Sequence, residues 1–575
     1  MRLNEDSYRK KVRAGWLGKC IGGNLGAIPE CLKKRSYFLK PEDFMPEKML
    51  ANDDLDLQLV WLQVLLDKGL SFTSDDLMEE FIKCYPANPN EYGYGKRNYR
   101  RGIKPPVSGT FANEFFMNSM GCPIRAEIWA MICPGRPEKG IELAYRDGCL
   151  DHGEESIYAE QYITALESLS FLSQDRLELI KKAMEYIPET SRIYHVISDI
   201  SGAFEKGSEL EKVMDYLETE YGDVDCSISF YNIGVIALAL LYGNGEFEKT
   251  ITLAVNCGYD TDCTAATLGA VLGIMYGEEI FGEKWLGYCG EEIITGCVNL
   301  HYDILTIDKL SRVTCNFGIE TDLQECGKEQ ADSFTIDYVG LPEIGPAKTA
   351  EIRVKLPLFL AGEENKLVWD LPDCLKMDKS GVEKKEKGTE YYYTIRMDET
   401  VGCLSDHYIL KAALKDSGGK TIRIQNIGLA GVQPFRILGP FWDMYDWKKV
   451  SEEERINQKM YFPFPEHKIF RYLSLAEAHN NFAFLNREYI SEDFDSDTFS
   501  DYFDAGKRYY AGEDSLRIDE MFGYKGPCCI YALQKLCLKT DEEVQFHIGS
   551  TTPFKLWVNG KEVYAMEDCK GYSQY

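Results

Sequence analysis

The sequence has 575 residues with a formal net charge of -29, and 45% of its residues are apolar. Its length predicts two to four domains, and its apolar content excludes wholesale disorder. The negative charge argues against nucleic acid or an anionic membrane as the main partner. The N-terminal segment lacks the apolar core of a signal peptide and no later run reaches membrane-spanning length, so we expect a cytoplasmic protein. The 19 cysteines form no CxxC pair, which agrees with a reducing compartment.

Helical periodicity dominates residues 1–312. Segments such as 175–186 and 208–218 place apolar residues at helical spacing, and Gly, Pro and Asn mark the joins between segments. Strand signals are sparse here. The pattern therefore predicts an all-α domain over residues 1–312.

A glycine-rich stretch lies near the start of this domain. Glycines occur at positions 15, 18, 22, 23 and 26, and the stretch leads into Glu30. Because glycine weakens an ordinary surface helix, the stretch indicates close packing or a loop that approaches a ligand. Taken alone, Glu30 would be a solvated loop carboxylate.

Two acidic clusters stand at the starts of predicted buried helices. Asn52-Asp53-Asp54 precedes a helix that is apolar nearly all round, and Asp260-Thr261-Asp262 follows Gly258 and precedes a run of small residues. Capping explains acids at a helix start. Four carboxylates at two buried helix starts would nevertheless repel one another unless cations lie between them. Their oxygen atoms suit magnesium, manganese or calcium better than zinc.

After about residue 313 the sequence favours strands. Segments 333–339, 352–358, 391–397 and 421–425 are rich in aromatic and β-branched residues and predict a β-sandwich over residues 313–436. A second, jelly-roll-like β domain is expected over 437–575. Its clearest element is a hairpin at 554–564, in which Asn559-Gly560 predicts a type I′ turn. This last domain is either closed by 567–575 or incomplete.

Common motifs are absent, since there is no P-loop, GxGxxG, HExxH or GxSxG. Four ordered blocks instead resemble the ADP-ribosylglycohydrolase family over residues 12 to about 290. They are GKCIGGNLGAIPE from Gly18, NDD from Asn52, MGCPIRAEIWAMICPGRPEKGIELAYRDGCLDHGEESIY from Met120, and GYDTDC from Gly258. The resemblance implies an all-α bundle that holds two magnesium ions between acid-bearing helix starts, with manganese as an alternative.

The resemblance also assigns roles to single residues. It makes Glu30 the catalytic residue, places His152 near the substrate, and gives the metal ligands as Asn52, Asp53, Asp54, Asp260 and Asp262. A buried structural role is the alternative for His152. For Arg125 and Asp147, in the same block as His152, we expect a buried ion pair that joins helices.

Three positions depart from the family pattern. Asn52 stands where the family usually has Thr or Ser, and its amide oxygen still suits a cation. Cys263 also stands where many members have Thr or Ser, and a thiol is a poor partner for a hard cation. Gly23 replaces a common Asp, a change expected to alter the hydrogen bonds around the site.

The implied function is hydrolysis of an N- or O-glycosidic bond in an ADP-ribosyl or related ribosyl conjugate. Two metal ions would fix the vicinal hydroxyls of a ribose and lower the pKa of a bound water, which Glu30 would orient or deprotonate as general base. Hydrolysis of another glycoside by the same fold is one alternative, and a non-catalytic sugar- or nucleotide-binding protein is another. The partner is thus a small-molecule or protein-linked glycoside. The β domains suggest carbohydrate binding, a structural role or homo-oligomer formation.

Overall fold

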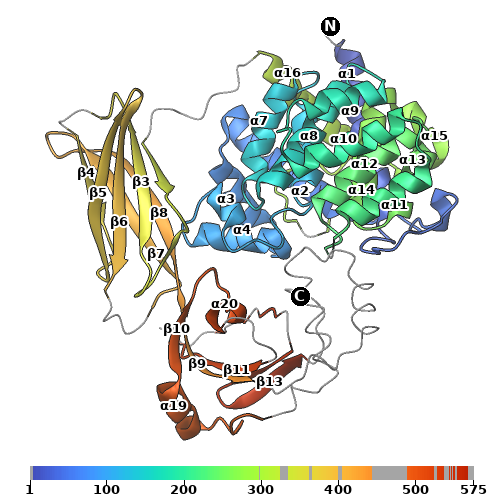
Figure 1. The fold of residues 1–575 in the computed structure, drawn as a ribbon. Coiled ribbons are helices and arrows are strands. Elements are labelled where there is room, and N and C mark those ends of the chain that lie inside the picture. The colour runs from blue at the N-terminus through green and yellow to red at the C-terminus, as the bar shows by residue number, and fades with distance from the viewer. Residues whose placement is uncertain are drawn as a thin grey trace. The chain divides into compact units, whose positions relative to one another are not determined.

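The computed structural model describes residues 4–223, 225–296, 298–323, 334–361, 365–398, 404–442, 488–522, 528–536, 543, 546, 548–550 and 553–566. The chain divides into two compact units, Met1–Ser333 and Phe334–Tyr575. Helices build the first unit, and strands dominate the second (Figure 1). The predicted order of an all-α part followed by β structure is therefore confirmed.

Helices α1 (Glu5–Gly26) and α14 (Thr261–Tyr276) pack along each other in the helical unit. Glycines at four-residue spacing form the contact face of α1, because this spacing repeats along one side of a helix. A Cβ atom added at Gly18 or Gly22 would lie 2.0 Å from a backbone oxygen of α14, that of Gly269 or Ala265. The glycine-rich stretch is therefore a site of close helix packing.

Helix α2 (Asp53–Lys68) is buried from Asp54 to Leu65, as its apolar sequence predicts. It packs beside α3 (Ser74–Cys84) and the short helix η3 (Pro123–Arg125). A single apolar cluster joins α1, α2 and α14 to most of the remaining helices. Among the helices that the structure describes, none is both long and apolar enough to cross a bilayer.

The other helices surround this core. The helical segments predicted at 175–186 and 208–218 are confirmed as α9 (Arg176–Met184) and α11 (Leu210–Tyr221). The remaining bounds are η1 Pro41–Asp43, η2 Gly69–Ser71, α4 Asn90–Arg100, α5 Val107–Thr110, α6 Ala126–Met131, α7 Pro137–Gly148, α8 Glu154–Ser170, α9 Arg176–Met184, α10 Arg192–Glu205, α11 Leu210–Tyr221, α12 Ser229–Tyr242, α13 Phe247–Cys257, η4 Glu278–Ile280, α15 Gly282–Cys289 and α16 Ile307–Leu323.

The second unit begins with a β-sandwich. Its two four-stranded sheets have the orders β1-β3-β6-β5 and β2-β8-β7-β4 and share one apolar cluster. Buried and more exposed residues alternate along β3, as expected for a strand with one face on a core. The strands are β1 Thr335–Tyr338, β2 Glu343–Ile344, β3 Ala350–Pro357, β4 Lys366–Asp370, β5 Leu375–Lys385, β6 Gly388–Met397, β7 His407–Lys415 and β8 Thr421–Gly431.

A second, smaller apolar cluster around Phe494, Tyr531 and Leu533 lies further along the chain. Here β9 (Gln433–Trp442) pairs with β10 (Lys507–Ala511) and β11 (Cys528–Leu533), while helices α19 (Ser496–Ala505) and α20 (Ile518–Phe522) lie between strands in the sequence. Strands β12 (Phe554–Val558) and β13 (Lys561–Met566) form a hairpin. Asn559 and Gly560 both have positive φ, 51° and 78°, so the predicted type I′ turn is confirmed.

Two elements span the limits that we predicted between domains. Helix α16 continues past residue 312, and strand β9 continues past residue 436. The division into three domains at these limits stays a prediction. The charged stretch 448–455 and the segment 567–575, which bears on whether the last domain is closed, lie outside the described residues.

The close contact of α1 with α14 predicts the effect of a single methyl group. Gly22→Ala places Cβ on the Ala265 carbonyl, so we expect a loss of about 1–3 kcal/mol in the free energy of unfolding of the helical unit. Gly202→Ala in α10 is the matched control, because its added Cβ meets no atom within 4 Å. The control should gain about 0.5–1 kcal/mol from helix propensity. Urea unfolding followed by far-UV circular dichroism measures both, and equal midpoints for the two variants would contradict the packing.

Candidate functional site

The two acidic clusters stand at helix starts, as their sequences predict. Asn52 is the N-cap of α2, and its Oδ1 accepts a hydrogen bond of 2.7 Å from the backbone N–H of Asp54. Asp260 is the N-cap of α14, and Asp262 lies in the first turn. Gly258, with a φ of 73°, ends α13 and lets the chain turn directly into α14.

These two helix starts meet in space. Asn52 Nδ2 donates to Asp262 Oδ2 at 3.4 Å, and Cys263 Sγ donates to Asp54 Oδ1 at 3.3 Å. One group of possible metal ligands comprises Asp54, Asp262 and Cys263, and a second comprises Glu30, Asp260 and Asp262. Within each group the ligand atoms lie within 4.8 Å of one another. Asp262 belongs to both groups, as a carboxylate that bridges two cations would.

Two predicted ligands are placed differently from the rest. Asp53 is exposed at the first position of α2 and belongs to neither group. The Oδ1 atom of Asn52 already accepts the capping hydrogen bond, and its amide nitrogen faces Asp262. The metal-ligand roles of Asn52 and Asp53 stay predictions.

The buried carboxylates lack the partners that their charges require. Oδ1 of Asp260 and Oδ1 of Asp262 are buried and have no hydrogen-bond partner. Burial, reinforced by Glu30 and Asp53, raises the pKa of Asp262 to about 7. The pKa of Asp260 is raised well above its usual range, mainly because the side chain is buried and secondly because of the charge of Asp262. Oxygen atoms in this state fit a hard divalent cation such as Mg²⁺ or Mn²⁺.

A buried lysine contacts this cluster. Lys19 of α1 donates to Glu127 Oε1 at 2.9 Å and to the Ile124 carbonyl at 3.0 Å, and its Nζ lies 3.3 Å from Asp54 Oδ2. Burial lowers the pKa of Lys19, but the charges of Asp54 and Glu127 outweigh this and raise it above its ordinary value. Sequence reasoning missed Lys19, although a charged residue inside a glycine-rich apolar helix was a usable signal.

Glu30 reaches the cluster from the loop that follows α1. This loop is fixed by two backbone hydrogen bonds, from Cys31 N to Tyr259 O at 2.8 Å and from Tyr259 N to Leu32 O at 3.0 Å. Glu30 is exposed as a whole, yet its carboxylate groups with those of Asp260 and Asp262. Desolvation, and then the charge of Cys31, raises the pKa of Glu30 to about 7. Such a carboxyl group is suited to proton transfer near neutral pH.

A pair of cysteines adjoins the Glu30 loop. Cys226, just before α12, has its Sγ 2.6 Å from Sγ of Cys31, and both cysteines are free. Nothing in the local sequence around either residue indicates this contact, because 195 positions separate them.

His152 lies in a buried polar network. Its Nδ1 is 2.6 Å from Asp151 Oδ1, and its Nε2 is 3.4 Å from Ser119 Oγ. Arg125 pairs with Asp147 at 2.8 Å and with Asp151 at 2.9 Å, all three side chains being fully buried. The expected ion pair of Arg125 with Asp147 is confirmed. His152 is also fully buried, which matches its structural alternative, and its contact with a substrate stays a prediction.

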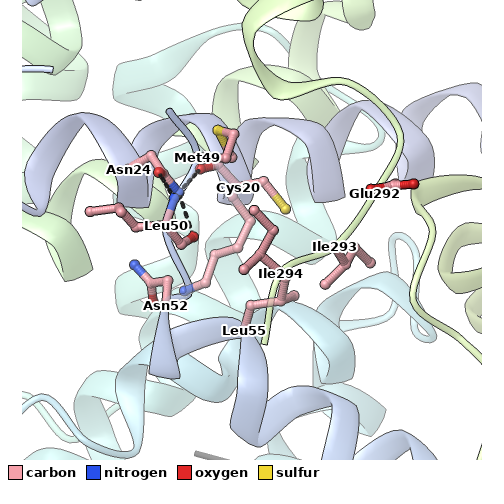
Figure 2. A pocket seen from close by; sticks show the side chains of 10 residues that line it. Cys20, Asn24, Met49, Leu50, Asn52, Leu55, Glu292, Ile293 and Ile294 are labelled. Atoms are coloured by element: carbon pink, nitrogen blue, oxygen red, sulfur yellow. Dashed lines mark hydrogen bonds between the residues drawn. The ribbon is translucent and has the colours of Figure 1, made fainter. Parts of the chain in front are cut away.

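A small cavity lies beside Asn52, lined also by Asn24, Leu50, Leu55 and Ile293 among others (Figure 2). Its volume of about 20 Å³ accommodates about one water molecule and no sugar. Asn24 accepts from the Leu50 N–H at 2.6 Å and donates to the Leu50 carbonyl at 3.2 Å, as Figure 2 shows. These bonds fix the segment that leads into Asn52 and the start of α2.

Comparison with known proteins places this site within a family. The sequence model of a family described as ADP-ribosylglycohydrolase matches residues 4–312, a range that holds every candidate site residue. No curated protein matches the chain significantly. A solved structure titled "ADP-ribosylglycohydrolase-related protein complex" is similar at 17% identity and a TM-score of 0.38, over 55% of this chain and 99% of that one.

The raised carboxyl pKa values predict how pH affects the stability of the metal-free protein. Between about pH 4 and about pH 7, folded Asp262 keeps a proton that the unfolded chain has released, so the free energy of unfolding falls as the pH rises. Added Mg²⁺ should reverse this loss above pH 7, because it binds the ionised carboxylates. Thermal unfolding with chelator and with Mg²⁺, over pH 4 to 8, measures both effects.

Two variants make this pH dependence specific. Asp262→Asn removes the titrating group and should flatten the decline with pH, whereas Glu209→Gln, which alters an exposed carboxylate before α11, should keep the wild-type profile. An unchanged slope in the Asp262 variant would contradict the assignment.

Proposed function

The chain belongs to the ADP-ribosylglycohydrolase family, and on that premise we propose that its helical unit hydrolyses an N- or O-glycosidic bond of an ADP-ribosyl or related ribosyl conjugate. One observation carries the proposal: Glu30, Asp260 and Asp262 converge from the α1 loop and the α14 start, and buried oxygens of both aspartates lack partners. A glycohydrolase needs a carboxyl group and a fixed charge beside the scissile bond. Glu30 offers the carboxyl group, and Asp260 and Asp262 offer the charged site.

The donor set of the cluster fits a pair of divalent cations. Asp54, Asp260 and Asp262 would hold them, with Asp262 shared, and Asn52 and Asp53 would complete the set from the start of α2. When bound, two such ions supply positive charge that anchors vicinal hydroxyl groups and lowers the pKa of water. We propose Mg²⁺, with Mn²⁺ as the alternative, because the ligands are mainly carboxylate oxygens.

Glu30 would act as the general base. Glu30 is exposed, which would let a substrate reach it, while Asp260 and Asp262 of α14 are buried. With a pKa of about 7, Glu30 can take a proton from water near neutral pH. The hydrogen bonds between Cys31, Leu32 and Tyr259 hold the loop, so the carboxylate is positioned before substrate binds.

Cys263 is the residue of the cluster least suited to magnesium. Its buried Sγ faces Asp54 rather than Glu30. Since a thiol is a weak ligand for a hard cation, we expect the ion beside Asp54 to bind more weakly than the ion beside Asp260.

The proposal predicts which substitutions stop turnover. Glu30→Gln removes the base while keeping the size of the side chain, so turnover should fall about 10²- to 10⁴-fold. The double variant Asp260→Asn, Asp262→Asn should lose metal-dependent turnover and also the stabilisation by Mg²⁺. Glu209→Gln serves as the control and should turn over as the wild type does.

The assay should pair an ADP-ribosylated peptide with simple aryl glycosides, each with and without chelator. We expect cleavage of the ADP-ribosylated peptide but not of the aryl glycosides, and we expect chelator to abolish it. Cleavage of aryl glycosides alone would indicate a glycosidase of the same fold. Full activity in the double aspartate variant would contradict the metal centre.

A further inference from the structure

A second group of possible metal ligands lies in the helical unit, outside the site described above. One ligand atom from each of Glu80, Cys84 and His301 lies within 4.8 Å of the other two, and we call these residues the Glu80–Cys84–His301 cluster. Glu80 and Cys84 come from the last two turns of α3, four positions apart and therefore on one face of the helix. His301 comes from the chain between α15 and α16.

Backbone hydrogen bonds hold the three residues together. Asn299 N donates to the Cys84 carbonyl at 2.8 Å, which fixes the segment before His301 to the end of α3. His301 N donates to Gln63 Oε1 at 2.6 Å, which ties the same segment to α2. Hydrogen bonds of the surrounding main chain therefore position the imidazole of His301.

The ring of His301 is oriented as in many metal sites. Its Nε2 lies 3.4 Å from Asp67 Oδ2, while its Nδ1 lies 3.5 Å from Glu80 Oε1. A histidine that ligates a metal through one nitrogen usually donates its other N–H to a carboxylate, which fixes the tautomer. Asp67 is placed to do this, and it leaves Nδ1 facing Glu80 and Cys84.

We propose that the Glu80–Cys84–His301 cluster binds a zinc-class divalent cation through one oxygen, one sulfur and one nitrogen atom. Cys84 Sγ lies 2.9 Å from Glu80 Oε1. With bonds of about 2.0 to 2.3 Å, ligand atoms around tetrahedral zinc are roughly 3.3 to 3.7 Å apart, so the cluster needs only small shifts to accept the ion. The mixed donor set selects zinc or cobalt over magnesium.

The cation that now contacts the cluster is a lysine. Lys83 contacts both oxygens of Glu80, at 3.2 and 3.1 Å, but its side chain is 64% exposed and can turn into solvent. His301 is also partly exposed, which gives a path for the ion, whereas Cys84 is buried. Three protein ligands leave a fourth position for water.

This site is distinct from the candidate metal centre. Gln63 and Asp67 lie 9 and 13 positions after Asp54 on the same helix α2, which at 1.5 Å per residue is about 14 to 20 Å along the axis. A cation bound by the cluster would fasten the segment around His301 to α2 and α3. Its expected role is therefore to stabilise the helical unit, not to take part in the reaction.

Cobalt absorption tests the proposal on the full chain, because a thiolate ligand gives Co²⁺ a charge-transfer band. A Cys263→Ser background removes the thiol of the other acidic group. In that background we expect a saturable band that Cys84→Ser abolishes and that Cys257→Ser, a change at a buried cysteine outside any such group, retains. Asp67→Asn should weaken cobalt binding about 10- to 100-fold.

Zinc binding gives a second readout. Zn²⁺ should raise the thermal unfolding temperature of the wild type but not of His301→Ala, whose exposed ring can be removed without loss of core packing. The proposal is overturned if the wild type shows no saturable Zn²⁺ or Co²⁺ binding, or if the Cys84 and His301 variants bind as tightly as their parent protein. His301 would then be only a surface partner of Asp67 and Glu80. Neither result bears on the Glu30 activity assay, so the two proposals fail separately.

Discussion

The contact between the backbones of α1 and α14 is the constraint on which the candidate site depends. Glycines 18, 22 and 26 leave no side chain between the two helices, and Cβ atoms at these positions would overlap the backbone of α14. Because Gly26 lies against Thr261, the end of α1 is fixed beside the start of α14. The Glu30 loop therefore leaves α1 next to Asp260 and Asp262. A wider separation of the two helices would move Glu30 away from Asp260 and Asp262.

The helix starts concentrate negative charge where the fold is least able to solvate it. Asp54, Asp260 and Asp262 are each at most 5% exposed, and their oxygens face one another rather than water. Helix N-termini offset part of this charge, yet a helix dipole is worth about 1 kcal/mol and cannot neutralise several buried carboxylates. The negative charge that remains is neutralised either by cations or by protons. The raised pKa values of Asp260 and Asp262 mean that these carboxyl groups hold protons more readily than usual.

The sequence predicted the features that local patterns determine. Periodicity separated the helical part from the β part, Asn559-Gly560 predicted a hairpin turn, and the two acidic clusters were placed at helix starts. Contacts between segments that are far apart in the sequence could not be predicted from local patterns. Lys19 contacts Glu127, which is 108 positions away in the sequence. His301 in an irregular segment contacts Glu80 in a helix. The glycines of α1 indicated close packing, but not that α14 is the partner.

Lys19 supplies a fixed positive charge beside the candidate metal centre. The ammonium group is buried, donates to Glu127 and the Ile124 carbonyl, and lies 3.3 Å from Asp54 Oδ2. The other oxygen of Asp54 faces Cys263, and no lysine or arginine pairs with Asp260 or Asp262 among the described residues. A fixed cation here would occupy the space in which we propose that substrate and metal bind. The fold thus neutralises part of the charge of Asp54 with its own side chain, and under the proposed function divalent ions from solution would neutralise the carboxylates beside Glu30.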